Sequence, residues 1–123
     1  MLRERLKLVI EKNPPLREIE DDLLNLISSI DSEDTLIIIV AGSTAEGRYV
    51  SGISDIDILV IKKAGPPTSR ITSIKDINVE ITFLGLDDAV EALKSKNYFI
   101  SQALDKGIYL KGEEIKKTIL NLL

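Results

Sequence analysis

A run of five consecutive apolar residues, four of them β-branched, constrains the fold of this 123-residue chain more than any other feature. The run is Leu36-Ile37-Ile38-Ile39-Val40, and Ala41-Gly42-Ser43 follows it directly. Because successive side chains of a strand point to opposite faces, an unbroken apolar run needs cover on both faces. The run therefore predicts a strand inside a sheet that carries helices on each side.

The rest of the chain supplies both the sheet neighbours and the helices. Apolar alternation predicts further strands at 54–62 and 77–84, and a short edge strand at 108–110. Between the first two, residues 63–74 contain Gly65-Pro66-Pro67 and are predicted to form a mobile loop or a loose hairpin. The predicted fold class is α/β (α+β), a small mixed central sheet flanked by helices.

Helices are predicted mainly at the two ends of the chain. Apolar residues at helical spacing start at Leu2, and Asn13-Pro14-Pro15 ends that helix; a second is predicted from Pro15 to Ile30. Three more are predicted at 87–94 with Asp87 as cap, at 98–106 closed by Gly107, and at 113–123 with Ile115, Ile119 and Leu122 inward. We expect one domain over 1–123, with a helical pair at 1–30 packed on a motif region at 36–112.

Composition excludes several classes of function. With neither Cys nor His, the chain cannot build a disulfide, a thiol nucleophile, a Ser-His-Asp triad or an imidazole zinc site. A net charge of −4 argues against broad nucleic-acid binding. No apolar stretch is long enough to span a bilayer, and the N-terminus does not resemble a signal peptide, so a cytoplasmic location is expected. Abundant Ile, Glu and Lys favour a thermophilic source.

Two acidic residues at the start of the second strand are the first candidate site. In Ser54-Asp55-Ile56-Asp57-Ile58 the two aspartates lie two positions apart, so in a strand they share one face, with Cβ atoms about 7 Å apart. Like charges beside an apolar strand are unfavourable unless a cation neutralises them, and Mg²⁺ prefers such ligands. The alternative is an exposed strand start whose aspartates are simply solvated.

Glu80 is the third candidate. It stands in Ile77-Asn78-Val79-Glu80-Ile81, where its side chain leaves the sheet on the face opposite Val79 and Ile81. If this strand pairs with the Asp55–Asp57 strand in suitable register, three carboxylates meet, which is the minimum for a two-metal site. The alternative is a solvent-facing glutamate on a half-buried strand.

Gly42-Ser43 and Arg48 suggest a site for phosphate. Glycine permits close approach of the backbone to a ligand, and amides at the start of the next helix can hold phosphate oxygens. Ser43-Thr44-Ala45-Glu46 also fits a capping box, with Ser43 as cap, and the two interpretations are compatible. Arg48 follows one turn later, where it can contact a triphosphate or remain a solvated surface residue.

In this order, the pieces resemble the nucleotidyltransferase superfamily typified by DNA polymerase β, and more closely the small stand-alone minimal nucleotidyltransferases. The resemblance covers about 36–112, including Ala103-Leu104-Asp105-Lys106-Gly107-Ile108-Tyr109-Leu110. It implies that Gly42 and Ser43 hold nucleotide phosphates, and that Asp55, Asp57 and Glu80 occupy the acidic positions. Three features depart from the pattern: Glu46 stands where a basic residue is common, Glu80 replaces the usual Asp, and the connection from Ser43 to Asp55 is longer.

The resemblance implies that the chain uses two Mg²⁺ ions to transfer an NMP to an acceptor hydroxyl. The expected NMP is AMP, taken from ATP. It further implies a possible partner, a small all-helical protein of the HEPN class, which the chain would neutralise or adenylylate as an antitoxin. A homo-oligomer is also compatible with the sequence. The rival hypotheses are a catalytically idle binding module of the same fold and a purely structural subunit. Lys63, Arg70 and Lys75 either close over a triphosphate or keep a turn soluble.

Overall fold

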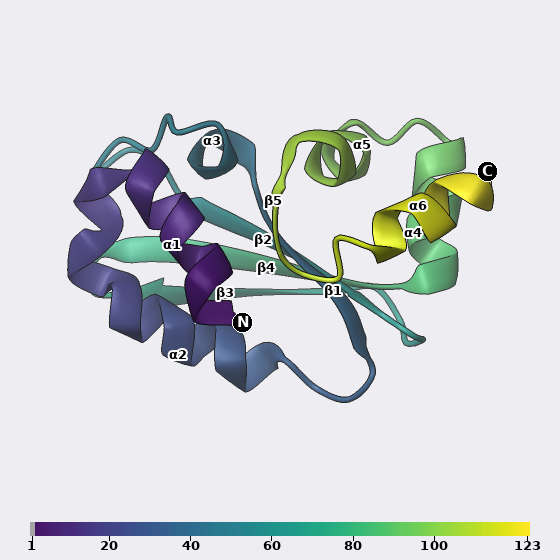
Figure 1. Ribbon diagram of the computed structural model, residues 1–123, viewed down its shortest axis with the longest axis horizontal. Coiled ribbons are helices and arrows are strands. Elements are labelled where there is room, and N and C mark those ends of the chain that lie inside the picture. Colours follow the sequence, from purple (N-terminus) through teal and green to yellow (C-terminus); the bar gives the residue numbers. More distant parts are fainter. Residues whose placement is uncertain (1) are drawn as a thin grey trace.

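The structure, a computed structural model, describes residues 2–123. Its elements follow in the order α1 (Leu2–Lys12), η1 (Pro14–Ile19), α2 (Glu20–Ile30), β1 (Thr35–Ala41), α3 (Gly42–Ala45), β2 (Ile56–Lys62), β3 (Thr68–Ile74), β4 (Ile77–Gly85), α4 (Leu86–Lys94), α5 (Tyr98–Lys106), β5 (Ile108–Lys111) and α6 (Ile115–Asn121). The predicted fold class, a mixed sheet flanked by helices, is confirmed (Figure 1).

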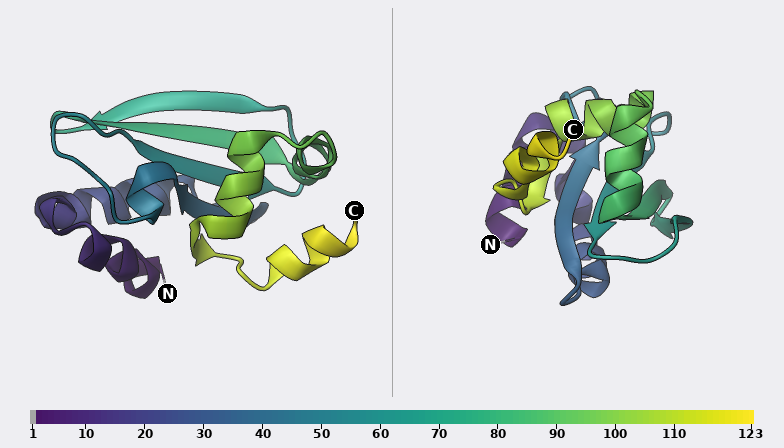
Figure 2. Two further views of the ribbon diagram at one scale, coloured as in Figure 1. Left: turned by 90° about the horizontal axis from the view of Figure 1, so that it is seen from above. Right: turned by 90° about the vertical axis from the view of Figure 1, so that its right-hand side faces the viewer.

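The five strands form one mixed sheet in the order β3-β4-β2-β1-β5. β1 pairs antiparallel with β2 and β5, whereas β2 pairs parallel with β4. β3 pairs antiparallel with β4 and lies at the outer edge of the sheet (Figure 2). The prediction of a mobile loop at 63–74 was wrong, because Thr68–Ile74 turns back through Lys75 and Asp76 and pairs with β4 along its whole length. The hairpin alternative describes this segment better.

Helices cover both faces of the sheet, as the apolar run at 36–40 predicts. α1, η1 and α2 bury one face, and α4, α5 and α6 pack on the other. The right-hand view of Figure 2 shows β1 standing between the N-terminal helices and α4. Ile38 contributes to the first core and Ile37 and Ile39 to the second, and all three are fully buried. Alternation along one strand thus builds two separate apolar layers.

Three predicted helix details were wrong at the ends of the elements. The second helix begins as the 3-10 turn at Pro14 and becomes α-helical at Glu20. α4 begins at Leu86 after Gly85, so Asp87 lies in the first turn and does not cap it. α6 is shorter than predicted, and Leu122 lies beyond its end with 51% of its surface exposed, while Ile119 is buried. Leu120 and Leu123 are exposed as well, so the end of this helix packs on the core through Ile119 alone among these four residues.

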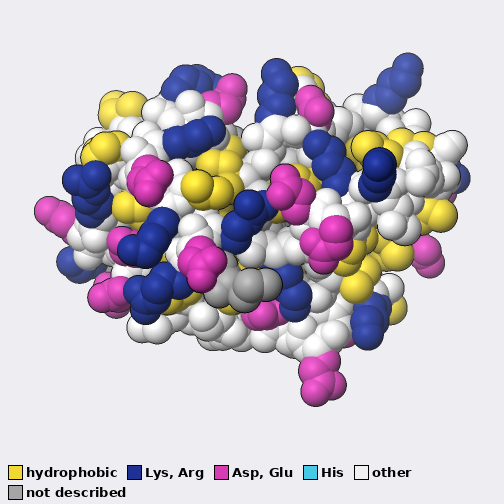
Figure 3. Space-filling model, viewed as in Figure 1, with side chains coloured by type: hydrophobic (Ala, Val, Ile, Leu, Met, Phe, Trp, Pro, Cys, Tyr) yellow, Lys and Arg dark blue, Asp and Glu magenta, His cyan; other side chains and the backbone are white. Residues whose placement is uncertain are grey.

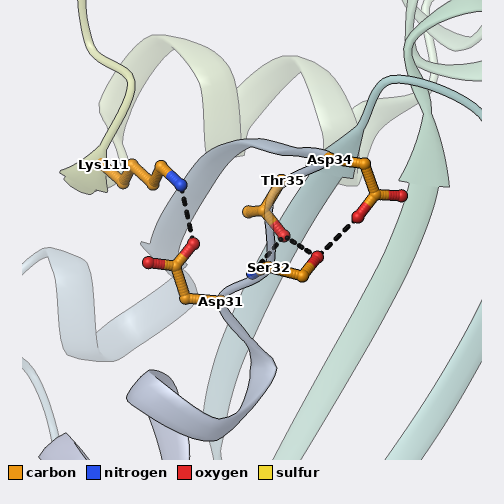
Figure 4. A network of polar contacts seen from close by, with 5 residues as sticks. All are labelled: Asp31, Ser32, Asp34, Thr35 and Lys111. Atoms are coloured by element: carbon orange, nitrogen blue, oxygen red, sulfur yellow. Dashed lines mark hydrogen bonds and ion pairs between the residues drawn. The ribbon is translucent and has the colours of Figure 1, made fainter.

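Polar contacts at the turn between α2 and β1 tie the N-terminal layer to the sheet (Figure 4). Lys111 of β5 pairs with Asp31 at 2.6 Å, and Ser32 donates to Asp34 while its backbone N–H donates to the Thr35 hydroxyl. The Ser32 hydrogen bond lowers the pKa of Asp34 below its ordinary value. This turn therefore fixes where α2 ends and β1 starts.

Within residues 2–123 we find no helix with the length and apolarity needed to cross a membrane. On the face shown in Figure 3, basic and acidic side chains are interspersed, without a large area of one sign.

Candidate active site

Two of the three predicted acidic residues lie side by side on neighbouring strands. Asp57 of β2 and Glu80 of β4 are register partners in the parallel pairing, so their side chains leave the same face of the sheet. Asp55 lies just before β2 and is exposed, whereas Asp57 is half-buried. Their flanking residues Ile56 and Val79 point into the opposite, N-terminal core. The condition that the sequence set for Glu80, a suitable register beside Asp57, is therefore met.

The electrostatics of Asp57 reflect this arrangement. Burial raises the pKa of the Asp57 carboxyl above its ordinary value, and the nearby charges of Glu80 and Asp55 raise it further. Burial raises the pKa of the Tyr49 hydroxyl, and the negative charge of Asp55 raises it further. Three carboxylates thus share one electrostatic environment, in which a bound cation would be favoured over further negative charge.

Gly42 brings the turn after β1 directly against this cluster. Its φ of +66° lies in the left-handed region, which glycine adopts without a Cβ penalty. A Cβ at this position would lie 2.8 Å from Asp57 Oδ2. Because β1 pairs with β2 in antiparallel register, Ala41 stands opposite Asp57, so the turn emerges next to the carboxylate. The glycine is required both by its backbone conformation and by the space that Asp57 occupies.

The predicted capping box at Ser43 is wrong. α3 begins at Gly42 with Ala41 as its N-cap, so Ser43 lies inside the helix and no side chain caps the helix start. Glu46 pairs instead with Arg48, whose guanidinium lies 2.6 Å from Glu46 Oε2. That hydrogen bond and the charges of Arg48 and Lys106 lower the pKa of Glu46. The one-turn helix is too short for the box, because position 46 follows its last residue.

A hollow of about 280 Å³ lies between α3 and α5. Gly42, which packs against Asp57, lines it, whereas the three acidic residues Asp55, Asp57 and Glu80 do not. Gly42, Ser43 and Arg48 line it from one side, and Lys106 and Tyr98 of α5 line it from the other. Sequence reasoning had assigned no role to Lys106 or Tyr98. No sequence signal pairs them with Gly42, since only the packing of α5 near α3 brings the two segments together.

The described part of the chain does not contain a ready-made metal cluster: among residues 2–123 no three acidic side chains are arranged to hold an ion together. The donor set is nevertheless of the kind that Mg²⁺ prefers, since it consists of carboxylate oxygens. Rotation of the exposed Asp55 and Glu80 side chains toward the half-buried Asp57 would be needed to complete it. The glycine at position 42 leaves the Asp57 oxygen uncovered on that side.

A larger hollow, of about 510 Å³, lies between α1 and β5. Both basic side chains that line it are committed to ion pairs, Arg5 with Glu113 and Lys111 with Asp31. Gly42, the glycine that packs against Asp57, lines the smaller hollow and not this one. We therefore place the candidate site at the smaller one.

Comparisons with known proteins agree with this fold. A family model described as nucleotidyltransferase domain matches residues 20–110, which is most of the chain. The chain therefore belongs to the nucleotidyltransferase domain family. A search of curated proteins gives no match.

Among solved structures, the chain is similar to a nucleotidyltransferase-like protein from Exiguobacterium sibiricum, with a TM-score of 0.60 and 12% sequence identity. The similarity covers 84% of this chain and 38% of that protein. At this identity it shows the shared fold, and this chain spans less than half of the other protein's length. The family match confirms the predicted membership of the nucleotidyltransferase superfamily, and the closer resemblance to the minimal nucleotidyltransferases stays a prediction.

Proposed function

We propose that this chain transfers a nucleoside monophosphate from a nucleoside triphosphate, with ATP the expected donor, to an acceptor hydroxyl. Family membership supports nucleotidyl transfer in general. The observation that carries the specific assignment is the pairing of Asp57 with Glu80 in register, with the Gly42 turn against Asp57. Gly42 connects these carboxylates to the neighbouring hollow, which two basic residues line.

Asp55, Asp57 and Glu80 are the residues that would hold Mg²⁺, with two ions expected from the resemblance. Their oxygen donors suit this hard cation, and a cation would offset both causes of the raised Asp57 pKa, first its burial and then the negative charges of Glu80 and Asp55. When bound, Mg²⁺ neutralises charge that develops on phosphoryl oxygens during in-line displacement. The protein contributes the position of the ligands and the open side next to Gly42.

The chain's own residues then account for binding and proton transfer. Gly42 and Ser43 hold the terminal phosphates of the triphosphate, and Arg48 and Lys106 offset their charge from the two sides of the hollow. Glu80 accepts the proton of the acceptor hydroxyl while the oxygen of that hydroxyl forms a bond to the α-phosphorus. The bond from the α-phosphorus to the bridging oxygen breaks, and pyrophosphate leaves with that electron pair.

We further propose that the acceptor hydroxyl belongs to a partner protein, of the small all-helical HEPN class that the resemblance implies. In that case the chain acts as an antitoxin that adenylylates its toxin. A second candidate, an idle nucleotide-binding module, is favoured by one observation: Glu46 holds the Arg48 guanidinium, so this cation is already paired.

The test is transfer of label from ATP carrying a radioactive α-phosphorus, with Mg²⁺ or Mn²⁺, to a small all-helical HEPN-class protein supplied as the acceptor, alongside calorimetric titration of ATP binding. We expect the full chain to bind ATP and, with the acceptor present, to label it and release pyrophosphate, and Asp57→Asn to lower transfer about 100-fold or more because a metal-ligating charge is lost. Asp22→Asn, which removes the same charge from an exposed position on α2, is the matched control and should be unchanged. Full transfer by Asp57→Asn would exclude the mechanism, and ATP binding without pyrophosphate would favour the idle module.

A further inference from the structure

One buried polar side chain connects the N-terminal helix to the turn of the candidate site. Asn13 follows α1 and has only 1% of its surface exposed. Its Nδ2 donates to the Val9 carbonyl at 2.9 Å and to the Thr44 carbonyl at 2.8 Å, and its Oδ1 accepts from the Tyr49 N–H at 3.1 Å. Both side-chain N–H donors and the side-chain oxygen are therefore used, on three separate segments.

These hydrogen bonds hold the segment that lines the hollow at two points. Thr44 lies in α3, next to Ser43, and Tyr49 directly follows Arg48. The one-turn α3 has no side-chain cap of its own, so external contacts must fix its position. Gly47, between the two attachment points, also packs on the carbonyl of Lys12, which would lie 3.4 Å from a Cβ placed there.

The local alternative is that Asn13 only finishes α1. One of its three hydrogen bonds does that, since Val9 lies four residues earlier in the same helix. The other two reach 31 and 36 residues along the chain and contribute nothing to the end of α1. Burying an amide is unfavourable unless all its groups are paired, so its presence here indicates a specific polar attachment. Asn13 also lies outside residues 20–110, the part that matches the family model.

We propose that Asn13 is a positioning residue for the nucleotide-binding turn, acting through the Thr44 carbonyl and the Tyr49 N–H. By fixing these two backbone groups it keeps Gly42 and Ser43 next to Asp57 and keeps Arg48 at the hollow. This inference rests on the proposed function for its effect on nucleotide binding, whereas the attachment itself stands on the hydrogen bonds alone.

The test compares two Asn13 variants with a matched packing variant in the full chain. Asn13→Asp is nearly isosteric: it keeps an oxygen for the Tyr49 N–H but sets an oxygen against the Thr44 and Val9 carbonyls. Asn13→Ala removes all three side-chain bonds and serves as the second variant if the aspartate prevents folding. Val9→Ala is the control, because Val9 is fully buried one turn earlier on α1 and its side chain makes no polar contact with α3.

The first measurement is amide hydrogen exchange of residues 43–49. Losing a buried hydrogen bond should speed exchange in this segment about ten-fold or more in the Asn13 variants, while β2 keeps its protection. Val9→Ala should lower stability throughout without singling out 43–49. Equal, uniform exchange in Asn13 and Val9 variants would overturn the proposal whether or not the chain proves to transfer nucleotides.

The second measurement is the split between KM and kcat for ATP. We expect the Asn13 variants to raise KM about ten-fold with a much smaller change in kcat, because the phosphate-holding turn is displaced while the carboxylates stay on the sheet. Val9→Ala should leave KM unchanged in the folded protein. An unchanged KM in a folded Asn13 variant would overturn the positioning role. If the wild-type chain neither binds nor transfers ATP, the proposed function fails, and the exchange measurement alone decides the attachment.

Discussion

The two faces of β2 differ sharply, although they alternate along the same seven residues. On the face toward α1 and α2, Ile56, Ile58 and Val60 are all fully buried, and the charged residue of this face, Lys62, comes only at the last position of the strand. On the other face, Leu59 and Ile61 are buried against the C-terminal helices, but Asp57 stands half-buried near the start of the strand.

This contrast separates stability from chemistry within one strand. The continuous apolar face anchors β2, so the opposite face tolerates a half-buried carboxylate whose ionised form is disfavoured. Because the pKa of Asp57 is raised in the folded state, its contribution favours folding below its ordinary pKa and is lost as pH rises through the raised pKa. At neutral pH the ionised Asp57 opposes folding, and a functional reason is needed for its presence.

Truncation on the apolar face should give the largest change in stability. Ile58→Ala removes a fully buried side chain and should lower the free energy of unfolding by about 2–5 kcal/mol, without altering ATP affinity of the folded fraction. Asp57→Asn should leave stability unchanged or raise it, since it removes the disfavoured charge. Urea denaturation with parallel ATP titration measures both. A destabilised Asp57→Asn would show that the carboxylate is structural, and the contrast between the faces would be wrong.

A substitution where the turn meets the sheet sharpens the same contrast. Gly42→Ala should lower the free energy of unfolding by about 1–2 kcal/mol, because a residue other than glycine is strained in the left-handed region. The new Cβ should also displace Asp57 and reduce transfer. Gly52→Ala is the matched control, because Gly52 also has a positive φ, of +81°, but no atom would lie within 4 Å of its Cβ. The two variants should have similar melting temperatures, but only Gly42→Ala should lose transfer activity. Equal activities would mean that contact between the turn and Asp57 does not matter.

The smallest expected effect lies at the rim of the hollow. Glu46→Gln removes the carboxylate that holds Arg48, so Arg48 and Lys106 should attract ATP more strongly and its affinity should rise several-fold. Glu91→Gln, which removes a similar exposed pair with Lys94 on α4, should have no effect. Titrations at low and high salt measure the difference, which should shrink as salt screens the charges. Weaker binding by Glu46→Gln would mean that Glu46 itself supports the nucleotide.

Local pattern was sufficient for much of the fold. The apolar run at 36–40 predicts a strand with cover on both faces, and alternation around Glu80 places its side chain on the face that the structure gives it. The glycine at 42 was predicted to allow close approach, and its positive φ agrees. These predictions succeed because side-chain period and glycine's conformational freedom are properties of the local chain.

Other features were missed because they depend on neighbours distant in the sequence. Residues 68–74 form an edge strand only because β4 is available to pair with them, and Gly-Pro-Pro nearby indicated a loop. The capping box at Ser43 fits the sequence, but the N-cap of α3 is Ala41, so the helix starts two residues too early for the box. Lys106 and Asn13 lie in segments that the sequence links only to the ends of helices, and their places near the 42–49 segment arise from how α5 and α1 pack.

The sequence by itself determined four of the five strands, the covered sheet and which acidic residues share a face, because these follow from backbone periodicity. The tertiary structure alone decided that Asp57 stands opposite Glu80, that Lys106 faces Gly42 across a hollow, and that Asn13 holds the turn from behind. The physical reason is that register and helix packing are fixed by burial and hydrogen bonding summed over the whole chain, and no short segment contains that sum.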